Sequence, residues 1–248
     1  MKKIAALLSF IFVISITAKA QTDFQLGLNF SPNISWFKAK TDNVTNEKTS
    51  LGFNFGIIGD FNIADNYAFS TGLNIVTIGG EISYPFVQEV DQIGSLSGRK
   101  TADITLKYVE IPLTLKLKTN EIGYLTYYGQ FGFGLGVNYD AKADVSFAYP
   151  STTGGSVSAK DVDYKDDINL LRASLIVGLG AEYNLSGNTS FIMGITFNNG
   201  FTNVLSEEGY ADDNNDGLGD VDASGKGSRN KDFKAINNYI LLNLGIIF

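Results

Sequence analysis

Residues 125–139 of the 248-residue chain are LTYYGQFGFGLGVNY, and this stretch decides the fold. Apolar residues alternate along it with small or polar ones. One face carries Leu125, Tyr127, Phe131, Phe133, Leu135, Val137 and Tyr139, and the other carries Thr126, Tyr128, Gln130, Gly132, Gly134, Gly136 and Asn138. A period of two is typical of a β-strand whose two faces meet different surroundings. The stretch therefore predicts a strand with one oily face and one polar or very small face.

The same division recurs to either side of this stretch, and helical periodicity is nowhere competitive. Eight segments show it, at residues 24–37, 51–63, 67–82, 104–118, 123–140, 169–185, 189–202 and 235–248. The connections alternate in length: they are long at 38–50, 83–103, 141–168 and 203–234, and short at 64–66, 119–122 and 186–188. Bacterial outer-membrane barrels have an even number of strands, short periplasmic turns and long outer loops. The sequence therefore predicts an all-β, closed, eight-stranded, antiparallel up-and-down transmembrane barrel.

The glycines indicate which face points inward. Gly132, Gly134 and Gly136, and again Gly178 and Gly180, lie on the polar face. The lumen of an eight-stranded barrel is just wide enough for side chains, so small residues suit inward positions, and lipid then covers the oily face. The alternative is a soluble periplasmic β-sandwich, in which the oily faces would pack against one another. Fractionation with the outer membrane would exclude that alternative.

Outward aromatic residues approach both ends of the predicted strands, where two interfacial girdles are expected. Those toward the short turns are Phe24, Phe61, Tyr67, Tyr127, Tyr183, Phe191 and Phe248, and those toward the long loops are Trp36, Phe53, Tyr139 and Phe197. Aromatic residues also favour strands in general, so girdles are one of two explanations for their abundance.

The two ends of the chain predict export. Lys2 and Lys3 precede an apolar run and the triplet Ala18-Lys19-Ala20, a pattern typical of a secretory signal peptide cleaved after residue 20. The mature domain would then span 21–248. The last strand ends in Phe248 after alternating apolar residues, which resembles the signal that the outer-membrane assembly machinery recognises. Lipid and that machinery are the expected partners, and the cell outer membrane is the expected location.

Composition excludes several classes of function. The chain has no cysteine, which excludes a lipid-anchored cysteine, a disulfide framework and a thiolate metal site. It has no histidine, the usual general base, so we expect no enzyme activity. Loss of the leader lowers the 19 basic residues by three to 16 against 26 acidic ones, a formal charge of −10. Such a chain is a poor partner for nucleic acid.

Five charged residues fall on inward positions, namely Asp60, Glu110, Lys116, Arg172 and Glu182. Charges that face a narrow lumen are expected to pair. The pattern favours an internal ion-pair network that plugs the barrel, and an ion pathway is the alternative. Cofactors are not expected.

The segment 212–222 contains the pattern D-x-N-x-D-G, in which alternate oxygens and a turn glycine can surround a calcium ion. The candidate ligands are Asp212, Asn214, Asp216, Asp220 and Asp222. The twelfth position is Ala223 rather than the bidentate Glu of a helix-flanked calcium loop. A solvated acidic loop is the competing interpretation.

Residues 107–118, KYVEIPLTLKLK, closely resemble the Tyr-x-Glu-Ile-Pro-Leu strand of PorT-like outer-membrane barrel proteins, and residues 27–33 resemble the first strand of that group. The resemblance covers essentially the whole mature chain. It implies an eight-stranded barrel in the outer membrane of a Gram-negative cell. The link of the PorT protein itself to protein secretion cannot be transferred to this chain on the fold alone. Pro112 lacks an N–H within its strand, which predicts a local bulge there and would explain why Ile104 and Leu106 fall out of phase with Val109, Ile111 and Leu113.

The sequence leaves three functions open. The first is a non-catalytic surface barrel with a structural or interaction role through its extracellular loops. The second is a narrow channel for small solutes or ions. The third, implied by the resemblance alone, is an accessory component of a secretion system.

Overall fold

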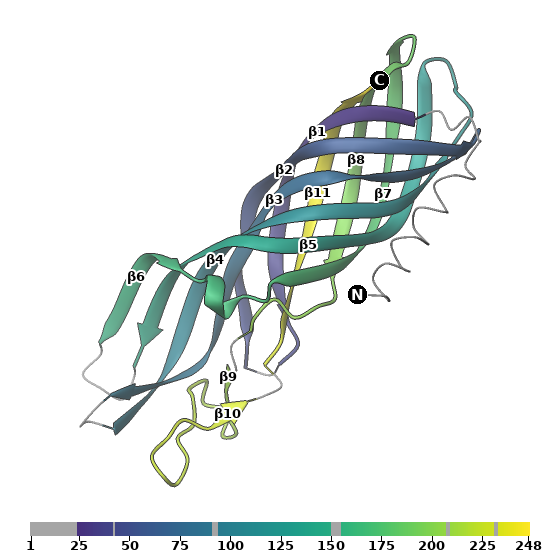
Figure 1. Cartoon of the computed structure of the whole chain (residues 1–248). Coiled ribbons are helices and arrows are strands. Elements are labelled where there is room, and N and C mark those ends of the chain that lie inside the picture. Colours follow the sequence, from purple (N-terminus) through teal and green to yellow (C-terminus); the bar gives the residue numbers. More distant parts are fainter. Residues whose placement is uncertain (1–23, 42, 91–93, 150–154, 207–208, 231–232) are drawn as a thin grey trace, which may run out of the picture.

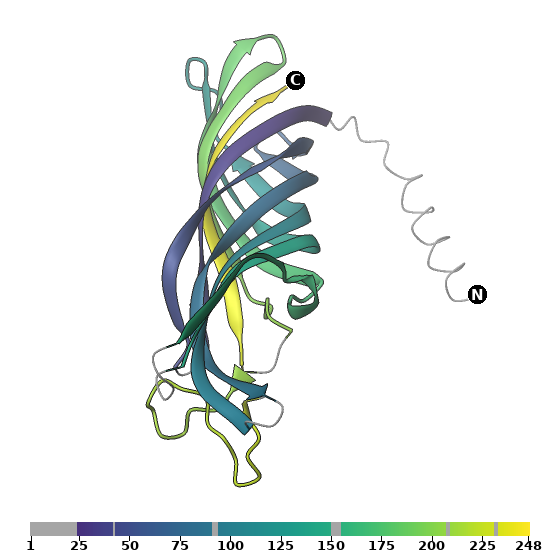
Figure 2. The same ribbon diagram turned by 90° about the vertical axis from the view of Figure 1, so that its left-hand side faces the viewer.

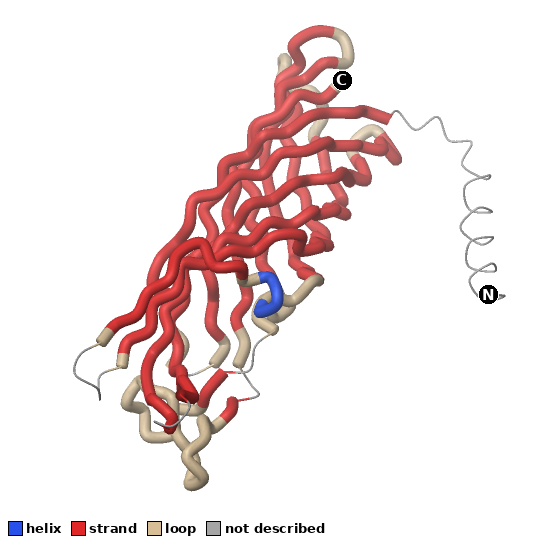
Figure 3. Tube along the Cα trace, turned by 60° about the vertical axis from the view of Figure 1, so that its left-hand side comes forward, coloured by secondary structure: helices blue, strands red, loops and turns tan. Residues whose placement is uncertain are grey.

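A computed structural model describes residues 24–41, 43–90, 94–149, 155–206, 209–230 and 233–248, so the predicted signal peptide lies outside the described residues. Eight antiparallel strands form a closed ring (Figures 1 and 3). In chain order they are β1 (Phe24–Ala39), β2 (Thr45–Ala64), β3 (Tyr67–Val90), β4 (Gly94–Lys118), β5 (Leu125–Ala148), β7 (Leu171–Ser186), β8 (Thr189–Gly200) and β11 (Ala235–Ile247). Each strand pairs with the ring strand that precedes or follows it in sequence, so the predicted eight-stranded up-and-down barrel is confirmed.

The first and last strands close the ring. Their ladder runs from Gly27 opposite Ile247 to Ala39 opposite Ala235. Leu26 and Phe248 extend it by exchanging two backbone hydrogen bonds of 3.0 and 2.8 Å. Closure gives every ring strand a paired neighbour on both sides, which is the condition for strands to cross a bilayer. No helix among the described residues is long and apolar enough to cross one.

The oily face points outward, as the sequence predicts. Phe131, Phe133 and Leu135 are 50, 55 and 52% exposed, whereas the glycines between them are buried. We call the band of outward apolar side chains the belt. A Cβ on Gly132 would lie 2.1 Å from the carbonyl oxygen of Leu113, so the crowded interior requires glycine at this position. The soluble sandwich is excluded, because its oily faces would be buried.

The two ends of the barrel differ (Figures 1 and 2). One end, the turn end, holds the connections 65–66, 119–124 and 187–188 and the last residue, so the predicted short turns are confirmed. The opposite loop end carries four elements that the sequence did not predict: β6 (Ser156–Asp163), η1 (Lys165–Asp167), β9 (Gly209–Tyr210) and β10 (Arg229–Asn230). β6 extends the sheet beside β5, and β9 pairs with β10.

The predicted strand bounds are wrong at the loop end. The expected loop 83–103 is almost entirely strand, because β3 continues to residue 90 and β4 begins at residue 94. Likewise β2 begins at residue 45 and β5 continues to residue 148. Above the belt these strands still place buried residues such as Ile82 and Ile104 inside, but polar residues such as Asp103 face out. The apolar-out pattern that marks the membrane segments is reversed there, so a search for that pattern ends too early.

The predicted bulge at Pro112 is also wrong. Pro112 stands opposite Gly134 in a ladder that keeps its register on both sides. The bulge lies farther along, between Lys107 and Tyr108, where Tyr139 of β5 is the extra residue. Ile104 and Leu106 need no bulge to explain them: both are fully buried inward residues, in step with Tyr108 and Glu110. They belong to an apolar core that fills the loop end.

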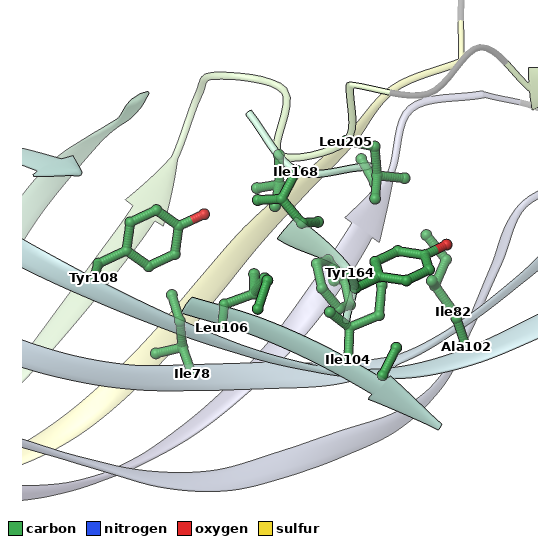
Figure 4. Packing of buried hydrophobic residues seen from close by; sticks show 14 of the residues in the cluster. Ile78, Ile82, Ala102, Ile104, Leu106, Tyr108, Tyr164, Ile168 and Leu205 are labelled. Atoms are coloured by element: carbon green, nitrogen blue, oxygen red, sulfur yellow. The ribbon is translucent and has the colours of Figure 1, made fainter. Parts of the chain in front are cut away.

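This core lies inside the barrel wall above the belt. Ile78 and Ile82 of β3 and Ile104 and Leu106 of β4 form part of it, and all four are at most 1% exposed. Figure 4 shows these side chains gathered with Tyr164, Ile168 and Leu205. The interior thus changes from polar within the belt to apolar at the loop end.

Candidate functional site

The turn-end half of the lumen holds a buried cluster of two lysines and two carboxylates. Lys116 Nζ lies 2.5 Å from Asp60 Oδ2 and 3.1 Å from Glu182 Oε1. Lys118 Nζ lies 3.1 Å from Glu182 Oε2 and 3.9 Å from Asp60 Oδ2. The Lys116 ammonium also lies 4.8 Å from the centre of the Tyr128 ring. The structure thus brings three of the five predicted lumen residues together across β2, β4 and β7.

Lys118 is the member of this cluster that the sequence analysis missed. It lies two residues after Lys116 on the same strand, so strand alternation places both on the inward face. That spacing could have identified Lys118 as an inward residue. Residue 118 ends the strand, however, and a lysine at a strand end commonly faces solvent.

A second cluster lies around the other two predicted residues. Arg172 Nη1 donates to Glu110 Oε2 at 3.0 Å, and Nη2 donates to Asn198 Oδ1 at 2.7 Å and to the Asn237 carbonyl at 3.1 Å. The Tyr239 hydroxyl donates to Glu110 Oε1 at 3.0 Å and accepts a 2.8 Å bond from Asn198. The guanidinium carbon of Arg172 lies 5.2 Å from the centre of the Tyr239 ring. The five predicted residues therefore form two clusters rather than one network.

A cavity of about 90 Å³ lies between the clusters, since Lys116 of the first and Glu110 and Tyr239 of the second all line it. Amides and hydroxyls form most of the remaining polar lining, including those of Gln130 and Thr196. Liquid water occupies about 30 Å³ per molecule. The cavity is large enough for a few waters.

An aromatic group surrounds a buried lysine at the loop end. Lys100 of β4 is 6% exposed, and its Nζ lies 4.9 Å from the ring centre of Tyr164, 5.5 Å from Phe86, 5.6 Å from Tyr84 and 5.9 Å from Phe147. Ammonium groups are attracted to the faces of aromatic rings at these distances. The arrangement ties β3, β4, β5 and the segment before η1 together above the apolar core.

The acidic loop between β9 and β10 is bound to the tip of the β3–β4 hairpin. The Arg99 guanidinium donates to the carbonyl oxygens of Gly217, Asn43 and Ser83, at 3.1 to 3.3 Å. The backbone N–H of Gly219 donates to the Gly98 carbonyl at 3.1 Å. Arg99 therefore joins three separate segments at the loop end. Arg99 also donates to the hydroxyls of Ser83 and Thr45, at 2.7 and 3.0 Å. The sequence did not single out this arginine, because carbonyl and hydroxyl partners leave no charge pattern in the sequence.

The predicted calcium ligands lie in this same loop. Their carboxylates accept backbone hydrogen bonds: Asp212 from Asp216 and Gly217, and Asp216 from Leu218, at 2.8 to 3.0 Å. Asp220 accepts one from Asp213 and Asp222 accepts one from Ser224. In the described part of the chain no group of three or more His, Cys, Asp or Glu residues is placed to hold a metal ion. Calcium binding stays a prediction.

A row of carboxylates crosses the outer surface of the sheet above the belt. Glu81 of β3 stands opposite Asp103 of β4, which stands opposite Asp144 of β5. Burial raises the pKa of the Asp103 carboxyl, the charges of Glu81 and Asp144 raise it further, and Lys48 opposes the shift. Like charges directly opposite one another destabilise a sheet. This row therefore costs stability at neutral pH.

The family described as outer membrane protein beta-barrel domain matches residues 19–216 of the chain. The match is to this broad family, and it does not support the finer PorT-like assignment. A search of curated proteins finds no match.

Solved structures with a similar arrangement share little sequence with the chain. The attachment invasion locus protein Ail of Yersinia pestis is 13% identical, with 90% of this chain and 98% of that chain covered and a TM-score of 0.36. OprG from Pseudomonas aeruginosa is 12% identical, with 91 and 94% covered and a TM-score of 0.47. The outer membrane protease OmpT from Escherichia coli is 10% identical, with 92 and 97% covered and a TM-score of 0.35. These likenesses carry no argument about function.

Proposed function

The chain belongs to the outer membrane protein β-barrel domain family, and from that membership we propose that it is a non-catalytic barrel of the outer membrane that acts through the surface of its loop end. Both described ends of the ring, Phe24 and Phe248, lie at the turn end. Barrels of this class place their short turns in the periplasm. The loop end then faces the cell exterior.

The filling of the lumen by side chains is the observation that carries this proposal. One charge cluster bridges β2, β4 and β7 in the turn-end half, a second joins Arg172 of β7 to Glu110 of β4, and the apolar core and aromatic group occupy the loop end. Water-filled conduction needs a continuous wet path. An apolar core several side chains deep interrupts such a path more firmly than a single ion pair would. The arrangement supports a closed barrel over a narrow channel for solutes or ions.

Strand pairing and hydrogen bonds hold the surface of the loop end together. The extended strands β3, β4 and β5 carry β6 beside them. Arg99 and its neighbours bind the acidic loop to the hairpin tip. Interaction sites in barrels are commonly carried by connections on a rigid scaffold. A surface of this kind suits contact with an extracellular or envelope partner, and its acidic loop suits a partner with positive charge.

Two measurements test the proposal. The protein should partition with outer-membrane fractions and migrate differently on a gel with and without heating. Purified protein in planar bilayers should give no steady conductance, and a stable single-channel current would refute the closed barrel. The absence of histidine supports a non-catalytic role.

Two narrower roles belong with this proposal. An accessory role in protein secretion rests on the resemblance of residues 107–118 to PorT-like proteins, and loss of secretion in a deletion strain would test it. Calcium binding by the loop rests on the D-x-N-x-D-G pattern. Isothermal titration should give heat that Asp212→Ala removes, and a titration without heat would end the idea.

A further inference from the structure

The barrel wall carries an apolar groove at the seam between β1 and β11. The groove measures about 350 Å³, and its outward lining residues are Pro32, Ile34, Leu51, Ile195, Ile240 and Leu242. The ladder of the seam has paired residues up to Asn29 and again from Asn33, with none between. Pro32 lies in this gap and has no N–H to donate. The groove therefore follows an interruption in the wall, within the belt.

Three lysines lie directly above this groove on the outward face of the same seam. Lys38 lies near the end of β1, Lys40 directly follows β1, and Lys234 directly precedes β11. All three lysines are exposed, whereas the adjacent residues Phe37 and Ala235 are buried. The backbone N–H of Lys40 donates to the Lys234 carbonyl at 2.9 Å, so these two lysines stand opposite each other. At about 3.4 Å per residue, Lys38 lies about 14 Å from Ile34 along the strand, toward the loop end.

An aromatic pair marks the boundary between groove and lysines. The rings of Trp36 and Phe197 stack with their centres 6.2 Å apart. Trp36 lies between Ile34 of the groove and Lys38 on the outward face of β1. Tryptophan at the end of an apolar belt is typical of the level where lipid headgroups begin. The seam thus presents apolar surface, then an aromatic pair, then positive charge.

We propose that this seam is a binding site for a lipid of the loop-end leaflet that carries an anionic phosphate headgroup. An acyl chain lies in the groove, and the phosphate lies among the ammonium groups of Lys38, Lys40 and Lys234. The proposal rests on the proposed function only in taking the loop end as the outer leaflet; the chemistry of the site is independent of it.

Charge complementarity supports this occupant. Two lysines directly opposite each other destabilise a sheet. An anion between them would attract both ammonium groups and offset their repulsion. Among the residues that the structure describes, no carboxylate lies within ion-pair distance of the three lysines, whereas Lys107 and Lys142 at the other side of the barrel each pair with an aspartate. A cationic group on an otherwise acidic protein is suited to an anionic headgroup.

Native mass spectrometry of the refolded full chain in detergent tests the site. Phosphatidic acid should be retained more strongly than phosphatidylcholine with the same acyl chains, and inorganic phosphate should bind much more weakly. A Lys38→Gln, Lys40→Gln, Lys234→Gln triple variant should lose about five-fold in affinity per lysine, about 100-fold in all. The matched control Lys142→Gln, Lys160→Gln, Lys165→Gln has the same net charge and should retain binding.

A second pair of variants tests the groove. Ile240→Trp should fill the groove and weaken the binding of phosphatidic acid. Val177→Trp, on the outward face of β7, should leave that binding unchanged. Arginine at the three lysine positions should preserve binding, which separates a charge effect from misfolding. The proposal would be overturned if the two triple glutamine variants lost the same affinity for phosphatidic acid. It would also be overturned if the wild type retained phosphatidic acid and phosphatidylcholine equally. Neither result would alter membrane partitioning or conductance, which test the proposed function.

Discussion

Replacing Arg172 with methionine should destabilise the barrel strongly, because it leaves a buried carboxylate without its cation. Arg172 and Glu110 are each 2% exposed, and their ion pair measures 3.0 Å. Breaking a buried pair by removing one partner typically costs about 3–5 kcal/mol. Methionine retains most of the side-chain volume, so the loss reports charge and hydrogen bonds rather than a cavity. The variant also removes the donors to Asn198 and to the Asn237 carbonyl.

The assay is reversible urea unfolding of the refolded protein in lipid vesicles, followed by tryptophan fluorescence and gel mobility. We expect the free energy of unfolding to fall by about 3–5 kcal/mol for Arg172→Met and by less for the Arg172→Met, Glu110→Gln double variant, because the double variant leaves no buried charge unpaired. The claim that the pair acts as a unit would be refuted if the free energy of unfolding of Arg172→Met lay within about 1 kcal/mol of the wild-type value. It would also be refuted if the double variant lost as much free energy of unfolding as the two single variants together.

Three further perturbations test other parts of the fold. Gly132→Ala should cost about 1–3 kcal/mol of unfolding free energy by overpacking against backbone, whereas Gly129→Ala, whose added Cβ would meet no atom closer than 4.0 Å, should cost much less by the same assay. Asp103→Asn should raise stability at neutral pH, and its advantage should shrink as pH falls through the raised pKa of Asp103, because the wild-type carboxyl then gains a proton; an advantage that is constant with pH contradicts this. Arg99→Ala should speed proteolysis of the loop that contains Gly217 while the membrane-embedded strands stay protected, and an unchanged cleavage rate would show that other contacts hold the loop.

The sequence predicted the membrane part of the barrel well because one physical rule governs every residue there. Lipid outside and a crowded lumen inside demand opposite side chains on alternate positions, as at Phe131 and Gly132. The rule changes above the belt, where Ile104 turns inward and Asp103 faces water. Local alternation cannot distinguish a reversed pattern from a loop, so strand length at the loop end was not predictable in this way.

The lumen shows a second limit of sequence reasoning. Parity alone placed Lys116 and Arg172 inside, but the assignment of partners depends on which strands face each other across the ring. Lys116 reaches Asp60 and Glu182, and Arg172 reaches Glu110, although all five share one interior. Height along the barrel decides the partner, and height depends on the stagger between strands, which the sequence does not state.

The change in the interior along the barrel axis makes the proposal of a non-conducting barrel more specific. Glu182 contacts Lys116 and Lys118 at the same time, through its two carboxylate oxygens at 3.1 Å each, so either contact could be given up while the other keeps the carboxylate paired. An apolar core has no such alternative, because opening it would expose side chains such as Ile78 and Leu106 to water. A stimulus that rearranged the charge clusters would therefore hydrate the turn-end half of the lumen and stop at the core. We therefore expect variants confined to the charge clusters to give no conductance in planar bilayers, and we expect conductance only when side chains of the loop-end core are removed.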